Sequence, residues 1–246
     1  MRGIIRRFEA LASTSTAIAA DAATLPHGAV YTAHSQTAGR GQRGNTWEAA
    51  PGQNLTFSML LRPAGIQPRE AFSISMLTAL SIADALESML PGQRVSVKWP
   101  NDIYVGDCKL CGILIENSFS GSSAVERSIV GIGINVNQRQ FLSDAPNPVS
   151  MASLSGHDFD LDAVLESVTD RILDDLDAYT AAPDIEALTA RYRARQWHGS
   201  GIHRWHDNLT GETIEAEIAG IAPDGMLTLA TVPPRTYAFK EVSALF

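Results

Sequence analysis

The stretch Gln36-Thr37-Ala38-Gly39-Arg40-Gly41-Gln42-Arg43-Gly44-Asn45-Thr46-Trp47 interleaves three glycines with two arginines. Glycine lets a ligand lie directly against the main chain, and successive exposed N–H groups form a concave donor surface for an anion. Arginine adds a planar cationic fork that suits phosphate or carboxylate. The stretch therefore indicates a loop that holds an anionic ligand, and not an ordinary surface turn.

Two familiar nucleotide-binding loops do not match this stretch. A Walker A loop would continue into Gly-Lys-Ser or Gly-Lys-Thr, which is absent here. A dinucleotide fingerprint should follow a strand and open a helix, whereas this loop leads into Trp47, a Pro51-Gly52 turn and an apolar strand pattern. The anion-binding loop is of another kind.

Length, charge and cysteine content limit the class of protein. The chain has 246 residues, 45% hydrophobic and 19% charged, which suits one large domain with a small appendage. A net charge of −8 argues against a general nucleic-acid binder. The two cysteines, Cys108 and Cys111, lie in one short segment, so we expect a reducing compartment, the cytoplasm. No apolar run is long enough to cross a membrane.

Hydrophobic periodicity predicts an α+β fold with mainly hairpin connections. The alternation of apolar residues over Asn54–Arg62 predicts a half-buried strand. Strands are expected at 4–8, 29–34, 54–62, 94–99, 103–105, 109–116 and 128–136, and helices after Ser13 and at 72–90, 161–179 and 185–192. Near residue 200 the pattern changes to short strands at 213–218, 226–231 and 236–240. This change predicts one domain over residues 1–199 and a small β domain over 200–246.

Two further stretches carry chemically capable residues. In Lys98-Trp99-Pro100-Asn101-Asp102, an amide and a carboxylate stand at a turn, and Lys109 follows at the start of an apolar strand. A lysine close to an anion-binding loop can neutralise phosphate, although a solvated strand end is the usual case. In Val130-Gly131-Ile132-Gly133-Ile134-Asn135-Val136-Asn137, glycines inside a strand mark close approach by a ligand or backbone, and Asn135 can both donate and accept hydrogen bonds.

Taken together and in order, these motifs resemble the biotin–protein ligase family, in the form that lacks an N-terminal DNA-binding domain. The resemblance covers nearly the whole chain. It consists of an early Ser-Thr pair, Gln-x-Ala-Gly-Arg-Gly-x-x-Gly before a Trp, Lys-Trp-Pro-Asn-Asp, Lys-Leu-x-Gly-Ile-Leu-x-Glu, and Gly-Ile-Gly-Ile-Asn. It implies a mixed-sheet catalytic domain like that of class II aminoacyl-tRNA synthetases, followed by a small C-terminal β-barrel.

The resemblance also implies a reaction in two steps. Biotin and ATP, with Mg²⁺, form biotinyl-5'-adenylate, and a lysine of a biotin-carboxyl-carrier protein then takes the biotin. The implied catalytic residues are Lys109 and Arg40. The implied biotin-binding residues are Ser13, Thr14, Gln36, Gly39, Arg40, Gly41, Lys109 and Gly112, and the implied ATP or adenylate residues are Arg40, Gln42, Trp47, Asn101, Gly133 and Asn135. The sequence identifies no Mg²⁺ ligands.

The chain departs from the family pattern at three places. Ser15 stands where many members have Asn, so the amide that would make one head-group hydrogen bond is missing. Gln42 stands where many have Arg, so we expect weaker retention of the adenylate. The Ser-Thr pair comes at Ser13, which leaves no room for a preceding helix-turn-helix domain, and we expect no sequence-specific DNA binding.

Other interpretations remain open beside this one. A lipoate–protein ligase of the same superfamily would use the same adenylation chemistry, and a non-catalytic biotin or nucleotide sensor would bind without reacting. Redox or metal chemistry at Cys108-x-x-Cys111 and a metal cluster at His198, His203 and His206 are the weaker interpretations, because structural zinc sites follow tighter spacing rules. The histidines and their neighbouring tryptophans are expected at the domain junction. The oligomeric state, monomer or homodimer, is open.

Overall fold

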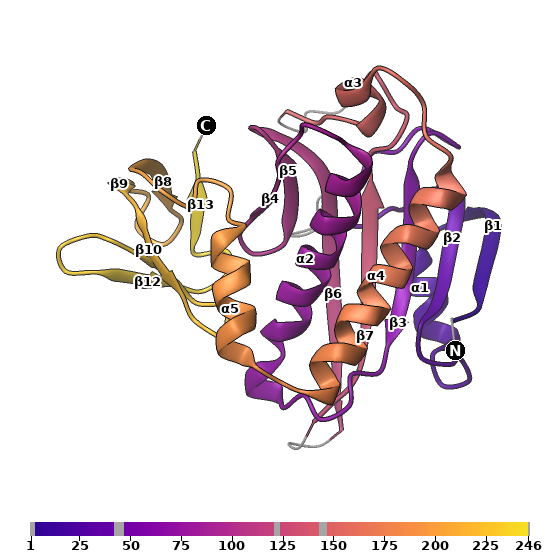
Figure 1. Ribbon diagram of the computed structural model, residues 1–246, viewed down its shortest axis with the longest axis horizontal. Coiled ribbons are helices and arrows are strands. Elements are labelled where there is room, and N and C mark those ends of the chain that lie inside the picture. Colours follow the sequence, from indigo (N-terminus) through magenta and orange to yellow (C-terminus); the bar gives the residue numbers. More distant parts are fainter. Residues whose placement is uncertain (1–2, 42–46, 121–123, 143–146, 246) are drawn as a thin grey trace.

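The computed structural model describes residues 3–41, 47–120, 124–142 and 147–245, and is built around one mixed sheet of seven strands (Figure 1). The strand order is β1-β2-β3-β7-β6-β5-β4. Only β1 and β2 pair in parallel, and the other neighbours are antiparallel. The strands are β1 (Ile5–Leu11), β2 (Ala29–Gln36), β3 (Leu55–Leu61), β4 (Val95–Lys98), β5 (Asp102–Val105), β6 (Cys108–Ser120) and β7 (Ala124–Ile134).

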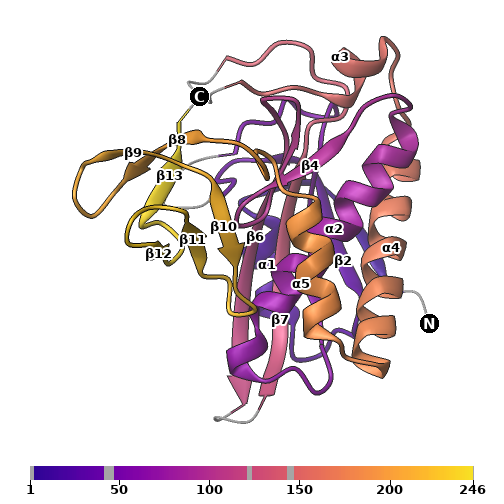
Figure 2. The same cartoon turned by 60° about the vertical axis from the view of Figure 1, so that its left-hand side comes forward.

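Helices cover both faces of this sheet. The helices α2 (Phe72–Met89) and α4 (Leu161–Ala181) lie on one face, and α5 (Ile185–Ala194) packs beside α2 (Figures 1 and 2). The short helix α1 (Thr14–Asp21) lies on the other face. A 3-10 turn (Pro68–Glu70) precedes α2, and α3 (Met151–Ser155) precedes α4. None of the described helices has the length and apolarity that a membrane crossing requires.

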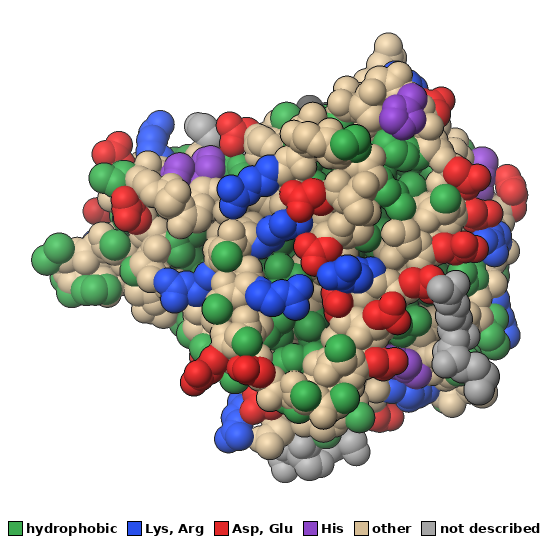
Figure 3. Space-filling model, in the orientation of Figure 1, with side chains coloured by type: hydrophobic (Ala, Val, Ile, Leu, Met, Phe, Trp, Pro, Cys, Tyr) green, Lys and Arg blue, Asp and Glu red, His purple; other side chains and the backbone are tan. Residues whose placement is uncertain are grey.

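Local signals fix where the long helix α4 begins. The Asp160 carboxylate accepts hydrogen bonds from the backbone N–H groups of Asp162 and Ala163, which satisfies two of the unpaired donors of the first turn. Apolar residues then recur at helical spacing and are buried against α2 and the sheet. The outward faces of α2, α4 and α5 carry interspersed acidic and basic side chains (Figure 3).

The strand β3 corrects one expectation from the sequence. All seven of its residues are buried, so the prediction of a half-buried strand was wrong. Phe57 and its alternate neighbours face the core beneath α2 and α4, as the alternation predicts. The second face is also covered, because Leu60 packs with Ile18 of α1 and Tyr31 of β2.

The C-terminal strands form two three-stranded sheets and do not form the expected barrel. Their orders are β10-β11-β12 and β13-β8-β9 (Figure 2). The strands are β8 (His203–Asp207), β9 (Thr213–Ala216), β10 (Ile218–Ile221), β11 (Leu227–Leu229), β12 (Arg235–Tyr237) and β13 (Val242–Ala244). A barrel needs an unbroken ring of paired strands, and within the described residues no ladder joins the two sheets. The prediction of a closed β-barrel was therefore wrong.

Candidate functional site

Three glycines leave one face of the sheet without side chains at its centre. Gly112 of β6 pairs directly with Gly133 of β7, and Gly131 lies two residues away on the same side. A Cβ added at Gly133 would come 2.3 Å from the Trp47 indole, and one at Gly112 would come 2.8 Å from it. A Cβ at Gly131 would lie 2.7 Å from the Ser15 hydroxyl. We call the surface of Gly112, Gly131 and Gly133 the glycine face.

The N-terminus of α1 borders the glycine face with buried polar groups. The backbone N–H of Thr14 donates to Gln36 Oε1 at 2.7 Å. The hydroxyl of Ser58 lies 2.8 Å from that of Thr14 and 2.9 Å from that of Ser15. Ser13 is buried at the N-cap position, but its side chain makes no capping hydrogen bond. These groups form a polar border of the glycine face, suited to a neutral hydrogen-bonding head group.

The first residues of the glycine-arginine loop, 37–41, follow β2, and Trp47 at its end lies over the same face. Its first residues continue the ladder, with Ala38 N donating to Ala12 O at 2.9 Å, and Trp47 N donates to Gly39 O at 3.3 Å. A Cβ at Gly39 would press on Gln36 and on the Trp47 carbonyl at 3.3 Å, so glycine allows the close turn. Gly41 is partly buried. Gln42 lies outside the described residues.

Arg40 is engaged by an acidic residue of β6. Its two terminal nitrogens donate to the two carboxylate oxygens of Glu116, at 3.2 and 2.8 Å. Both side chains are 45% exposed. The loop and β6 are therefore joined by a bidentate ion pair that spans 76 positions of sequence.

Lys109, near the start of β6, lies close to the Trp47 ring. Its Nζ is 2.6 Å from Asp102 Oδ2 and 5.9 Å from the centre of the Trp47 ring. Its backbone N–H donates to Asn147 O, and its carbonyl accepts from Val149 N and, at 3.4 Å, from Asn135 Nδ2. The lysine is therefore held at the glycine face by its main chain on one side and by Asp102 on the other.

Two buried polar atoms beside Lys109 have no hydrogen-bond partner among the described residues. They are Nε1 of Trp47 and Oδ1 of Asn135. A buried polar group without a partner costs about 1–3 kcal/mol. One donor and one acceptor are thus available to a ligand at this place.

The turn between β4 and β5 brings a second lysine close to Asp102. Burial lowers the pKa of Lys98 to about 8, and the negative charge of Asp102 partly opposes this shift. The Lys98 Nζ lies 5.0 Å from the ring centres of both Tyr104 and Trp197. Asn101, in the same turn, is buried. The region around Asp102 therefore combines one carboxylate with two lysines, a setting that favours anionic groups of a substrate.

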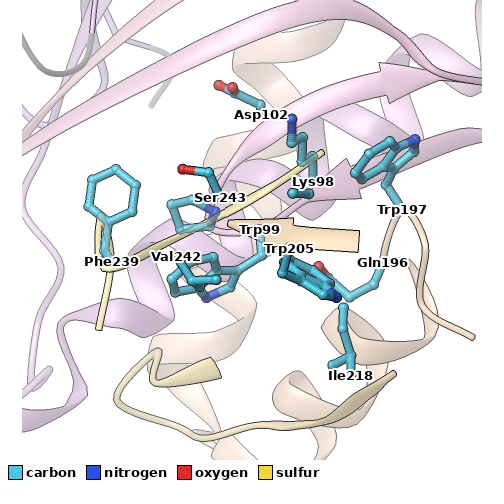
Figure 4. A pocket seen from close by; sticks show the side chains of 12 residues that line it. Lys98, Trp99, Asp102, Gln196, Trp197, Trp205, Ile218, Phe239, Val242 and Ser243 are labelled. Atoms are coloured by element: carbon cyan, nitrogen blue, oxygen red, sulfur yellow. The ribbon is translucent and has the colours of Figure 1, made fainter. Parts of the chain in front are cut away.

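A pocket of about 130 Å³ separates this turn from the C-terminal sheets (Figure 4). Trp99 forms part of its wall, stacks edge-on against Phe239 at 6.1 Å, and donates its Nε1 to Gly225 O. Trp205 also lines it and donates to Ala216 O. Trp99, which the sequence analysis did not place at the junction, thus joins the turn to the C-terminal strands, and Trp205 lines the pocket beside it.

The cysteines and histidines show no metal site in the described residues. No three Cys, His, Asp or Glu side chains there are grouped as metal ligands, so no Mg²⁺ ligand is assigned either. Cys111 is fully buried, which raises the pKa of its thiol and disfavours redox chemistry. His198 stacks between Trp197 and His203 and lies 3.3 Å from Asp107.

Three contributors were missed by the sequence analysis. Ser58 bridges the two α1 hydroxyls, Asp102 holds Lys109, and Glu116 holds Arg40. Asp102 and Glu116 stood within the quoted motifs, but no partner could be assigned to them. Ser58 was detectable only as a polar residue inside a strongly apolar strand.

Comparison with known proteins agrees with this arrangement. A family model described as Biotin/lipoate A/B protein ligase family matches residues 8–135. The biotin–[acetyl-CoA-carboxylase] ligase of Paracoccus denitrificans is 36% identical over 173 residues, which cover 65% of this chain and 68% of that protein. The bifunctional ligase/repressor BirA of Bacillus spizizenii is 32% identical over 148 residues, 58% of this chain and 44% of that protein.

A solved structure extends the likeness over the whole length. The biotin protein ligase of Aquifex aeolicus in complex with biotin and ATP matches with a TM-score of 0.81 and 25% identity, covering 98% of each chain. The chain spans about two thirds of the Paracoccus protein and less than half of the Bacillus one.

Proposed function

The chain belongs to the biotin/lipoate A/B protein ligase family, and from this premise we propose that it activates biotin with ATP and transfers it to a lysine of a biotin-carboxyl-carrier protein. One observation carries the proposal most directly. On the glycine face, Gly131 adjoins the polar end of α1 at Ser15, whereas Gly112 adjoins Trp47 and Lys109. A molecule with a neutral hydrogen-bonding head and an anionic tail fits this order of groups.

Different residues bind different parts of the ligand, according to the chemistry of their side chains. The hydroxyls and amide at the α1 end bind the head group, and the chain of the ligand lies beside the Trp47 indole, which packs directly on Gly112 and Gly133. Arg40 and Lys109 neutralise the carboxylate and the α-phosphate. The proposed head-group and chain residues are Ser13, Thr14, Gln36, Gly39, Gly41 and Gly112, and the proposed adenylate residues are Gln42, Trp47, Asn101, Gly133 and Asn135.

Neither chemical step needs an enzyme nucleophile. In the first, a carboxylate oxygen of biotin bonds to the α-phosphorus while the bond to pyrophosphate breaks. In the second, the lysine amine bonds to the acyl carbon while AMP leaves with the electrons of the acyl–oxygen bond. Catalysis by this site is positioning and charge neutralisation, which fixed cations supply at little reorganisation cost. Mg²⁺, when bound with ATP, adds further neutralisation of the phosphates.

The test is ATP–pyrophosphate exchange with biotin, lipoate or octanoate as the only acid. We expect exchange with biotin alone. Exchange with lipoate instead would support the same adenylation mechanism in a lipoate–protein ligase. The proposed head-group residues would then bind lipoate and not biotin. No exchange with any acid would refute the ligase and favour a sensor.

The role of Lys109 is tested in the same assay. We expect Lys109→Ala to lose exchange by about two orders of magnitude, because a fixed charge at the transferring phosphate is removed. Arg69→Ala is the matched control, since Arg69 is 76% exposed and lies outside the glycine face. Exchange that survives Lys109→Ala at the wild-type rate would overturn the assignment.

Several finer statements belong to the same proposal. They are a catalytic unit of the class II aminoacyl-tRNA synthetase type over residues 1–199, a small β domain over 200–246, Mg²⁺ supplied with ATP, and action in the cytoplasm. The junction pocket and its tryptophans support the boundary, because they pack the later sheets against the turn that follows β4.

A further inference from the structure

Glu116 places a negative charge beside a site proposed for anions. It lies on β6 four residues beyond Gly112, on the side of the strand that carries the glycine face. Its neighbour across the ladder, Ile129, packs with the cluster beneath α1 and not with the core beneath α2. The carboxylate is therefore on the ligand side of the sheet.

The geometry of the ion pair decides what Arg40 can offer a ligand. Glu116 receives both terminal nitrogens of the guanidinium, so the end-on edge of the fork is fully used. That edge binds carboxylate or phosphate best, since two parallel N–H···O bonds form there. A substrate anion that takes the same edge must displace Glu116.

We propose that Glu116 is a competitor for Arg40, holding the guanidinium in the ligand-free protein and releasing it to the biotin carboxylate or the adenylate phosphate. The proposal rests on the proposed function. Glu116 touches no reacting atom and acts through Arg40, so it is a positioning residue. The competition lowers the affinity of the site for biotin and for the biotinyl-adenylate. This lower affinity favours release of the biotinyl-adenylate to the acceptor lysine.

The strength of the competition follows from exposure. Both partners are 45% exposed, and exposed ion pairs are individually weak. Once Arg40 has left, however, the Glu116 carboxylate repels the bound anion as well. Together these effects amount to a change of about three- to tenfold in affinity and not to an on–off switch.

A different role for the same pair predicts the opposite sign. If Glu116 only tethered the glycine-arginine loop in its binding shape, loss of the carboxylate would loosen the loop and weaken biotin binding. A competitor, once removed, strengthens binding. The direction of the change therefore separates the two roles.

The experiment compares Glu116→Gln with wild type by calorimetric titration of biotin and by exchange kinetics. The substitution keeps the size of the side chain and removes its charge. We expect biotin to bind about three- to tenfold more tightly, the KM for biotin to fall by a similar factor with kcat for exchange little changed, and the adenylate to dissociate more slowly. In an Arg40→Gln background the same substitution should give a smaller gain in affinity, because only the repulsion between the Glu116 carboxylate and the bound anion is then removed.

Asp162→Asn is the matched control. Asp162 is a carboxylate that pairs with an arginine, Arg7, at 3.0 Å, and it belongs to α4 on the other side of the sheet. Removing it changes the net charge by the same amount without touching the glycine face, so biotin affinity should stay at the wild-type value.

Each outcome bears on the proposal. Weaker or unchanged binding in Glu116→Gln, or an equal gain in the Arg40→Gln background or in Asp162→Asn, overturns the competitor role. These results are distinguishable from failure of the proposed function, which would appear first as a wild-type protein that neither binds biotin nor supports exchange, and which would remove the competitor role with it.

Discussion

Gly133→Ala tests whether the glycine face exists to receive Trp47 and the ligand. Gly133 pairs with Gly112 across β6 and β7, and its absent side chain is the space that the indole fills. An added Cβ would lie 2.3 Å from Trp47 Cε2. Because ordinary contact begins near 3.4 Å, the ring would have to retreat by about an ångström.

The expected cost follows from this overlap. The neighbouring atoms belong to a rigid two-ring system, so the clash cannot be relieved by turning a flexible side-chain end. Overpacking of this kind costs about 1–3 kcal/mol in the free energy of unfolding. For a protein of this size, that lowers the Tm by roughly 2–4 °C per kcal/mol. Gly112→Ala should cost less, because its Cβ would meet only the far edge of the ring at 2.8 Å.

Thermal unfolding, tryptophan emission and biotin-dependent exchange together provide the assay. We expect Gly133→Ala to lower the Tm, shift the emission of Trp47 and reduce exchange more than Gly112→Ala does. Gly220→Ala is the control, because Gly220 lies in strand β10 with no atom within 4 Å of the added Cβ. A Gly133→Ala protein that matches Gly220→Ala in all three measurements would refute the packing argument.

Three further substitutions test other parts of the structure. Ser58→Ala removes the hydrogen-bond partner shared by the buried hydroxyls of Thr14 and Ser15. It should lower the free energy of unfolding, measured in urea, by about 1–3 kcal/mol. An unchanged urea midpoint would show that these hydrogen bonds do not contribute to stability. The pKa of Lys98 in the folded protein, about 8, lies below its ordinary value of 10.5, so the unfolded chain binds more protons between these values and stability rises with pH there. The Tm of wild type should therefore rise relative to that of Lys98→Met between pH 8 and 10, and a constant difference would argue against the buried charge. Arg195, at the end of α5, forms ion pairs with Asp84 and Glu87 of α2 at 3.1 and 2.5 Å. Arg195→Met should therefore lower the free energy of unfolding by about 1–3 kcal/mol. An unchanged free energy of unfolding would show that these ion pairs add nothing to stability.

The sequence by itself determined most of the strands and helices before residue 200 and pointed to an anion-binding site, but the strands β8 and β13 and the short helix α3 were not predicted. Alternation in β3 and helical spacing in α2 and α4 predicted those elements to within a few residues, because the period of the apolar residues follows the repeat of the backbone. The glycines on either side of Arg40, and the position of Lys109 at the start of an apolar strand, pointed to an anionic ligand. The five motifs, in their order, indicated the family to which the chain belongs.

Only the tertiary structure decided how these pieces meet. Alternation along β3 could not reveal that α1 covers its second face, and short strands near the C-terminus could not reveal that they form two sheets without closing. The partners of Arg40 and Ser15, and the indole above Gly133, come from segments tens of residues away in sequence. Local sequence specifies dihedral preference and which face is apolar, whereas contacts across the sheet depend on strand order and register, which the whole core fixes together.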